Sequence, residues 1–192
     1  MRTAEFDRQQ VLEAAMDVFC QKGYANTTMQ DLKLATGLHP GSLYCAFKNK
    51  RGVLLAALTQ FIESRWQQSQ VCFESGDPLE GIHQYLRQLV AKLCLSQSHC
   101  LLSRTVADFS AVDEDIRETL SEPWQQLLVR IEQQLQLAQT QGLLRQGVMP
   151  AEAAWVLLVN IFGLRSLPSF MADEKSLYAC VDLQIQLIRE PQ

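Results

Sequence analysis

The sequence has few of the residues and patterns on which enzymes and metal proteins depend. It contains only three histidines, its six cysteines show no CxxC or Cys/His ligand spacing, and it has no glycine-rich phosphate loop. A structural zinc site, a nucleotide-binding loop and a recognisable catalytic triad are therefore not expected. These absences predict a protein that is not an enzyme and that needs no metal or cofactor.

Long apolar runs are also missing. The most apolar segment, Ala153 to Leu164, is interrupted by Asn160 and is shorter than the roughly 20 residues that span a bilayer. The N-terminus is mixed and polar, without the apolar core of a signal peptide. We therefore expect a cytoplasmic protein with no membrane partner, whose cysteines are free thiols rather than a disulfide framework.

No segment alternates between apolar and polar residues for long enough to predict a strand. Apolar residues recur instead at helical spacing, which predicts an all-α chain with a three-helix N-terminal unit followed by a larger helical bundle. The later helices are expected at about 79–95, 101–112, 121–141, 151–166 and 174–188. The residues expected to separate them are Pro123, Gly142, Pro150, Pro168 and Asp173.

Charge is distributed unevenly along the chain. The formal net charge of −4 is unfavourable for a DNA-binding protein. Residues 1–51, however, carry seven Lys/Arg and five Asp/Glu, so this segment is net positive while the remainder is net negative. Positive charge thus lies on one end of the chain, where it can attract phosphate groups.

The most informative stretch is 27–51, which predicts two short helices joined by a tight turn. Thr28 and Asp31 have the spacing of a capping box, and Gly37 marks the end of the first short helix. Pro40 suits the first turn of the second helix, and Asn49 suits the cap of the next one. A basic cluster follows at once. This arrangement is typical of a helix-turn-helix on a DNA backbone.

From about Val11 to Leu54 the sequence resembles the tetracycline-repressor (TetR) family of bacterial transcription regulators. The matching residues are Ala14-Ala15, Phe19, Lys22-Gly23-Tyr24, Thr27-Thr28-Met29, Asp31-Leu32, Gly37, Gly41-Ser42-Leu43-Tyr44, Phe47 and Asn49-Lys50. The resemblance implies a DNA-binding domain at 1–50 and an effector-binding and dimerisation domain at 51–192. It also implies a homodimeric repressor that binds a palindromic operator and is released by a small-molecule effector.

The resemblance assigns DNA contacts to ten residues. Hydroxyls and cations are expected on phosphates, and the remaining residues are expected near base edges. His39, Pro40 and Ala46 depart from the residues that many relatives carry at these positions, so the operator sequence does not follow from the family. The ten residues are Thr28, Gln30, His39, Pro40, Gly41, Ser42, Tyr44, Cys45, Lys48 and Lys50.

Two further sites are expected in the C-terminal part. The effector pocket is predicted from aromatic and polar residues: Phe61, Trp66, Cys100, Arg104, Phe109, Trp124, Trp155 and Phe162, with Asn160 and Arg165 as further polar groups. The dimer interface is predicted on the last two helices, because the segment around residue 159 is apolar nearly all round. Its candidates are Val156, Val159, Phe162, Leu177, Val181 and Ile185.

Two alternatives stay open. Cys100 is expected at the start of a helix with Arg104 one turn later, an environment that lowers the pKa of a thiol and favours electrophile or redox sensing. The same fold could also serve an architectural DNA-binding protein that has a protein partner in place of a small ligand.

Overall fold

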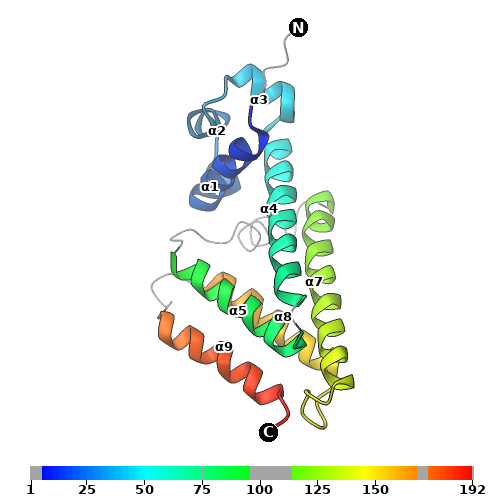
Figure 1. Cartoon of the computed structure of the whole chain (residues 1–192). Coiled ribbons are helices and arrows are strands. Elements are labelled where there is room, and N and C mark those ends of the chain that lie inside the picture. The colour runs from blue at the N-terminus through cyan, green and yellow to red at the C-terminus, as the bar shows by residue number, and fades with distance from the viewer. Residues whose placement is uncertain (1–5, 75, 96–113, 168–172, 192) are drawn as a thin grey trace. The chain divides into compact units, whose positions relative to one another are not determined.

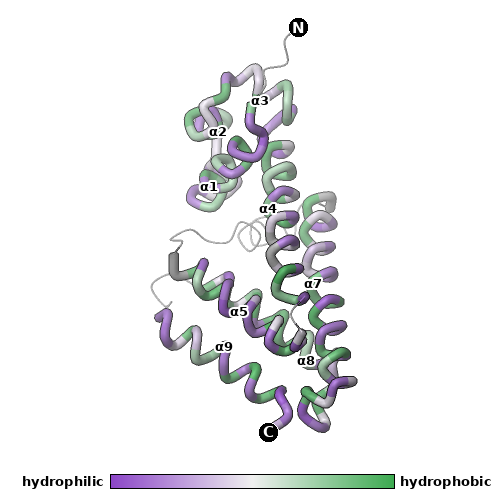
Figure 2. The backbone as a smooth tube through the Cα atoms, viewed as in Figure 1, coloured by the Kyte–Doolittle hydropathy of each residue, from purple (hydrophilic) through white to green (hydrophobic). Residues whose placement is uncertain are grey.

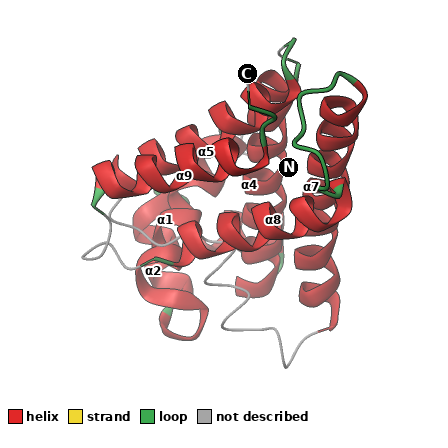
Figure 3. Cartoon of the chain, turned by 90° about the horizontal axis from the view of Figure 1, so that it is seen from below, coloured by secondary structure: helices red, strands yellow, loops and turns green. Residues whose placement is uncertain are grey.

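A computed structural model of the chain describes residues 6–74, 76–95, 114–167 and 173–191. Within these residues the regular elements are helices, and the only β-type pairing is the isolated bridge between Leu144 and Arg189 (Figure 3). The all-α prediction is therefore confirmed. The helices are α1 (Arg8–Asn26), α2 (Met29–Thr36), α3 (Pro40–Phe47), α4 (Lys50–Phe73), α5 (Pro78–Leu95), α7 (Glu114–Thr140), α8 (Pro150–Ser166) and α9 (Glu174–Ile188) (Figure 1).

The chain forms two compact units. Two of the boundaries between them fall inside helices, one in α4 and one in α7. The first unit holds α1 to α3 and α4 up to Ser64, together with α7 up to Leu120. The second unit holds the rest of α4 and α7 with α5, α8 and α9. The predicted DNA-binding domain of residues 1–50 lies inside the first unit.

Local capping explains where the first helices begin and end. Asp7 caps α1 by accepting hydrogen bonds from the backbone N–H groups of Gln9 and Gln10 at 3.0 and 3.2 Å. Thr28 and Asp31 form the predicted capping box at the start of α2, and Gly37 ends that helix in the left-handed conformation at φ 68°. Gly23 interrupts α1 at φ 75°, and helical structure resumes as far as Asn26.

The core of the first unit joins its helices through fully buried apolar side chains. Phe19 of α1, Leu32 of α2 and Leu43 of α3 are each almost completely inaccessible to solvent. From α4, Leu54 and Leu58 are equally buried. Because α2 packs on both α1 and α3, this core fixes the orientation of the two short helices.

One predicted break is wrong. Pro123 was expected to separate helices, but it lies inside α7, which runs unbroken from Glu114 to Thr140. Proline removes one backbone donor and crowds the preceding turn. The long helix is retained because residues on both sides of Pro123, including Leu120, Leu127 and Ile131, are buried.

The core of the second unit surrounds α5, which packs against both α8 and α9. Apolar residues of α5 recur at helical spacing between polar ones (Figure 2), and Leu79, Ile82 and Leu86 are fully buried. α8 contributes Ile161 and α9 contributes Val181 to the same core.

Polar contacts hold α9 on α5. Asp182 of α9 accepts from Arg87 Nη1 at 2.7 Å and lies 2.7 Å from His83 Nε2. At the C-terminal end, Arg189 pairs with Asp77 at 2.9 Å. Hydrogen bonding by His83 and Arg87 lowers the pKa of the Asp182 carboxyl below its ordinary value.

None of the described helices is long and apolar enough to cross a membrane. Cys20, Cys45, Cys72 and Cys180 are free thiols. Cys20 and Cys72 are buried, whereas Cys45 and Cys180 are exposed. Cys100 lies outside the described residues.

Candidate nucleic-acid interface

Helix α3 is the second helix of the predicted helix-turn-helix and hence its expected recognition helix, and it has one buried and one solvent-facing side. Leu43 and Phe47 point into the core, with exposed fractions of 0% and 5%. Tyr44, in contrast, is 49% exposed. Gly41 and Cys45 are also exposed, so the outer side of α3 presents a glycine, a thiol and a phenol to solvent.

The N-terminus of α3 is capped by a histidine. His39 Nδ1 accepts a hydrogen bond from the backbone N–H of Gly41 at 3.2 Å, and Pro40 occupies the first turn. Accepting at Nδ1 places the proton of a neutral imidazole on Nε2. His39 is exposed, so its ring caps α3 and still presents a free edge to solvent. The sequence had predicted only a base contact for this residue.

The other predicted DNA contacts also lie in this unit. Thr28, Gln30 and Lys48 are exposed, while Pro40 and Ser42 are half-buried. All are on α2, α3 or the residues next to them. The structure thus keeps the predicted residues on the solvent-accessible parts of the helix-turn-helix.

Lys50 has a structural role that the sequence did not reveal. Its ammonium donates hydrogen bonds of 2.8 Å to the backbone carbonyl oxygens of both Tyr24 and Thr27. It also lies 4.2 Å from the centre of the Tyr24 ring, a cation–π contact. Lys50 therefore ties the start of α4 to the end of α1, and a substitution there would disturb the fold as well as any phosphate contact.

The turn between α3 and α4 is strained. Lys48 has φ 68° and ψ −51°, and the Asn49 backbone N–H donates to the Phe47 carbonyl at 2.8 Å. These are the features of a γ-turn with positive φ, a rare and strained conformation. Because Lys48 is exposed, the turn projects a cation directly after the recognition helix.

A salt bridge fixes α1 against the start of α2. Lys22 Nζ lies 2.7 Å from Asp31 Oδ1, while Asp31 Oδ2 accepts from the Thr28 backbone N–H at 2.8 Å and from its hydroxyl at 2.7 Å. The hydrogen bond from Lys22, followed by those from Thr28, holds the pKa of Asp31 well below its ordinary value.

This shift predicts a pH dependence. A carboxyl whose pKa is lowered by folding adds stability above its unfolded-state pKa of about 3.9, and that stability is lost as the pH falls further. In urea denaturation between about pH 3 and 7, we expect the Asp31→Asn protein to be less stable near neutrality and to lose less stability on acidification than the wild type. Parallel stability curves for the two proteins would contradict this role of Asp31.

Comparison with known proteins shows which family the helix-turn-helix segment resembles. The profile described as "Bacterial regulatory proteins, tetR family" matches residues 11–57. The HTH-type transcriptional repressor ComR of Escherichia coli is 42% identical over 62 residues, which cover 32% of this chain and 30% of ComR. The N-terminal segment of this chain therefore matches the TetR family.

Longer similarities within the family extend beyond the helix-turn-helix. The HTH-type transcriptional regulator AcrR of Shigella flexneri is 25% identical over 171 residues, covering 84% of this chain and 77% of AcrR. A structure of the TetR-family regulator CifR, a cysteine mutant with 26-bp operator DNA, matches with a TM-score of 0.80 and 24% identity. It covers 96% of this chain and 98% of the CifR chain, so the TetR-family fold extends over nearly the whole chain.

Three of the predicted pocket residues come together in the second unit. The rings of Trp124 and Phe162 meet edge to face, with centroids 5.6 Å apart. The Arg165 guanidinium lies 5.6 Å from the centre of the Trp124 ring and donates to the Tyr85 hydroxyl at 3.1 Å. Arg165 is buried, so this cluster places a cation among aromatic rings.

The remaining pocket candidates do not join that cluster. Trp155 is 58% exposed, which places it outside any enclosed pocket of the described chain. Trp66 lines a separate open groove, and Phe61 belongs to the first unit. Cys100, Arg104 and Phe109 lie outside the described residues.

Half of the predicted dimer interface requires correction. Val156, Val159 and Phe162 of α8 are 59%, 64% and 39% exposed. Leu177, Val181 and Ile185 instead belong to the core of their own unit, so they are not available to a second chain. The exposed apolar residues of α9 are Leu183 and Leu187.

Proposed function

We propose that this protein is a TetR-type repressor that binds a palindromic operator as a homodimer and releases it when a small molecule binds its second unit. It would act in the cytoplasm, with double-stranded DNA as its main partner. The observation that carries the proposal is the exposed side of α3, which is positioned by buried Leu43 and Phe47 and is followed directly by Lys48.

The chemistry of that surface suits a DNA groove. Tyr44 and Ser42 offer hydroxyls to phosphates, and the absence of a side chain at Gly41 permits close approach of the helix. The Nε2 edge of His39 suits an acceptor such as guanine N7 or O6, and Gln30 suits adenine. Lys48 provides a phosphate contact, while Lys50 acts mainly by holding α4 to α1.

An exposed apolar face supports the homodimer. Val156, Val159 and Phe162 on α8 and Leu183 and Leu187 on α9 are large apolar side chains that a single chain leaves in contact with water. Two-fold pairing through these helices would bury these side chains against a second copy of the chain. Such a dimer would present two recognition helices about 34 Å apart, one turn of DNA.

Operator selection from randomised duplexes tests the proposal. We expect one enriched palindrome for the wild type, and strongly reduced binding for Tyr44→Ala. Lys48→Gly should keep or improve stability, because glycine accepts the positive φ at low cost, yet it should lower the salt dependence of binding by about one counterion. Salt-sensitive binding without an enriched motif would indicate an architectural protein, and absence of binding would refute the proposal.

A further inference from the structure

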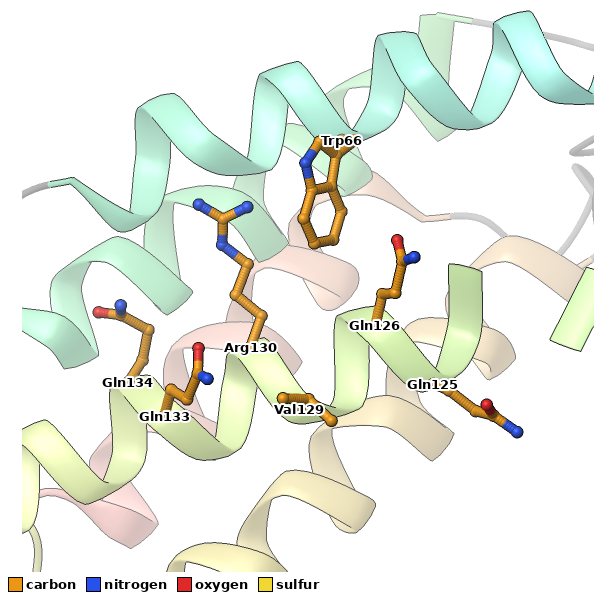
Figure 4. A pocket seen from close by; sticks show the side chains of 7 residues that line it. All are labelled: Trp66, Gln125, Gln126, Val129, Arg130, Gln133 and Gln134. Atoms are coloured by element: carbon orange, nitrogen blue, oxygen red, sulfur yellow. The ribbon is translucent and has the colours of Figure 1, made fainter. Parts of the chain in front are cut away.

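A groove between α4 and α7 in the second unit carries the chemistry of a ligand site (Figure 4). Its volume is about 690 Å³, within the range that holds a small organic ligand. Among the residues that the structure describes, Arg130 is the only charged one that lines it. The lining residues, called the Trp66 groove below, are Trp66, Gln125, Gln126, Val129, Arg130, Gln133 and Gln134.

Aromatic rings, rather than a carboxylate, hold Arg130 in place. Its guanidinium lies 4.7 Å from the centre of the Trp66 ring and 5.5 Å from that of Phe73. Within the described ranges of the chain no acidic side chain pairs with it. Aromatic faces orient a guanidinium without neutralising its charge. The Trp66 groove therefore contains a cation that is held in place and whose N–H groups do not pair with a carboxylate of the described residues.

The other lining residues define the rest of the ligand. Trp66 is half-exposed, and Val129 is 52% exposed, so the groove offers an aromatic face and an apolar contact. Four glutamine amides supply neutral donors and acceptors. A single cation suits a ligand with a single negative charge, and a guanidinium forms bidentate hydrogen bonds with a carboxylate. We infer that the Trp66 groove binds a small aromatic carboxylate, with its acid group on Arg130 and its ring against Trp66.

The position of Trp66 connects this site to the proposed function, on which its role as an effector site rests. Trp66 belongs to α4, the helix that begins at Lys50 immediately after the recognition helix and its turn. A ligand on Trp66 therefore contacts the same helix that carries the Lys50 link to α1. Binding would lower operator affinity to the extent that the ligand prefers the released conformation.

Calorimetry on the full-length protein tests the site with three probes. Benzoate should bind, and benzamide, which keeps the ring but lacks the charge, should bind at least tenfold more weakly, a difference of about 1.4 kcal/mol. Cyclohexanecarboxylate, which keeps the charge but lacks the aromatic ring, should also bind more weakly. These three probes compare charge and aromaticity on the wild-type protein, so the test does not depend on the folding of any variant.

Variants then assign the interaction to its residues. Arg130→Met keeps an unbranched side chain against the rings and should bring benzoate affinity down to that of benzamide. Trp66→Leu should remove the preference for benzoate over cyclohexanecarboxylate. Arg117→Met is the matched control, because Arg117 is an exposed arginine of α7 outside the groove. Circular dichroism of each variant establishes that it is folded.

Each outcome decides a separate point. Any of three results would overturn the assignment of the ligand site. They are an absence of benzoate binding up to about 10 mM, equal affinity for benzoate and benzamide, and an unchanged benzoate affinity in the folded Arg130→Met protein. Benzoate binding that leaves the affinity for the selected operator unchanged would overturn its role as the effector class. Benzoate binding by a protein that selects no operator would count against the proposed repressor function while supporting the ligand site.

Discussion

The Gly52→Ala protein is expected to lose about 3 kcal/mol of stability in its N-terminal unit and most of its operator affinity. Gly52 lies in the first turn of α4, where a Cβ atom would fall on the carbonyl oxygen of Phe47. That carbonyl is already committed to the Asn49 N–H within the γ-turn at Lys48. The added methyl group would therefore meet backbone that cannot move without opening the turn.

Opening the turn would affect DNA binding directly. Phe47 ends α3 and is buried, so displacing its carbonyl moves the recognition helix relative to the core. A shift of this kind separates Lys48 and Tyr44 from any phosphates they contact, and we expect the operator affinity to fall at least about tenfold. Chemical denaturation and operator titration at fixed salt measure the two effects.

Gly41→Ala is the matched control for stability. A Cβ atom at Gly41 would meet only His39 Nδ1, at an ordinary distance of 3.4 Å, and Gly41 lies within α3. Alanine should therefore maintain or raise stability there, by up to about 1 kcal/mol. If Gly52→Ala is as stable as Gly41→Ala, the close contact with the turn does not constrain the domain.

Sequence predicted the features of this unit that depend on neighbours along the chain. The capping box of Thr28 and Asp31, the glycine stop at Gly37 and the proline start at Pro40 involve residues only a few positions apart, and all three are present. The pairing of Lys50 with carbonyls more than 20 residues earlier has no local signal. The γ-turn was equally hidden, because lysine is not a residue that indicates positive φ.

The second unit shows a different limit of sequence reasoning. Along α9, Leu177, Val181 and Ile185 repeat at four-residue spacing, as do Leu183 and Leu187. Periodicity reveals both apolar faces, but it does not reveal which one the protomer buries in its own core. Continuous helical patterning likewise concealed that Pro123 is accommodated within α7. Tertiary packing decides such points, and it involves residues distant in sequence.

The second large effect is expected at the apolar face of α8. Val159→Glu should convert the proposed dimer into monomers and weaken operator binding by about two orders of magnitude. Val159 is 64% exposed in the single chain, between exposed Val156 and Phe162. In a two-fold interface each substitution appears twice, so two carboxylates would be buried without partners. Light scattering coupled to gel filtration measures the mass, and titration of the selected palindrome measures the affinity.

Val71→Glu distinguishes a lost interface from a general effect of charge. Val71 is 74% exposed on α4, in the same unit as α8 and α9, but on a different helix. Its substitution should leave both mass and operator affinity unchanged. A Val159→Glu protein that stays dimeric would place the interface elsewhere. If the Val159→Glu protein has the mass of a dimer but no operator affinity, assembly and DNA recognition are separate properties. In the proposed mechanism, the dimer contributes to binding by holding two recognition helices at the spacing of one DNA turn.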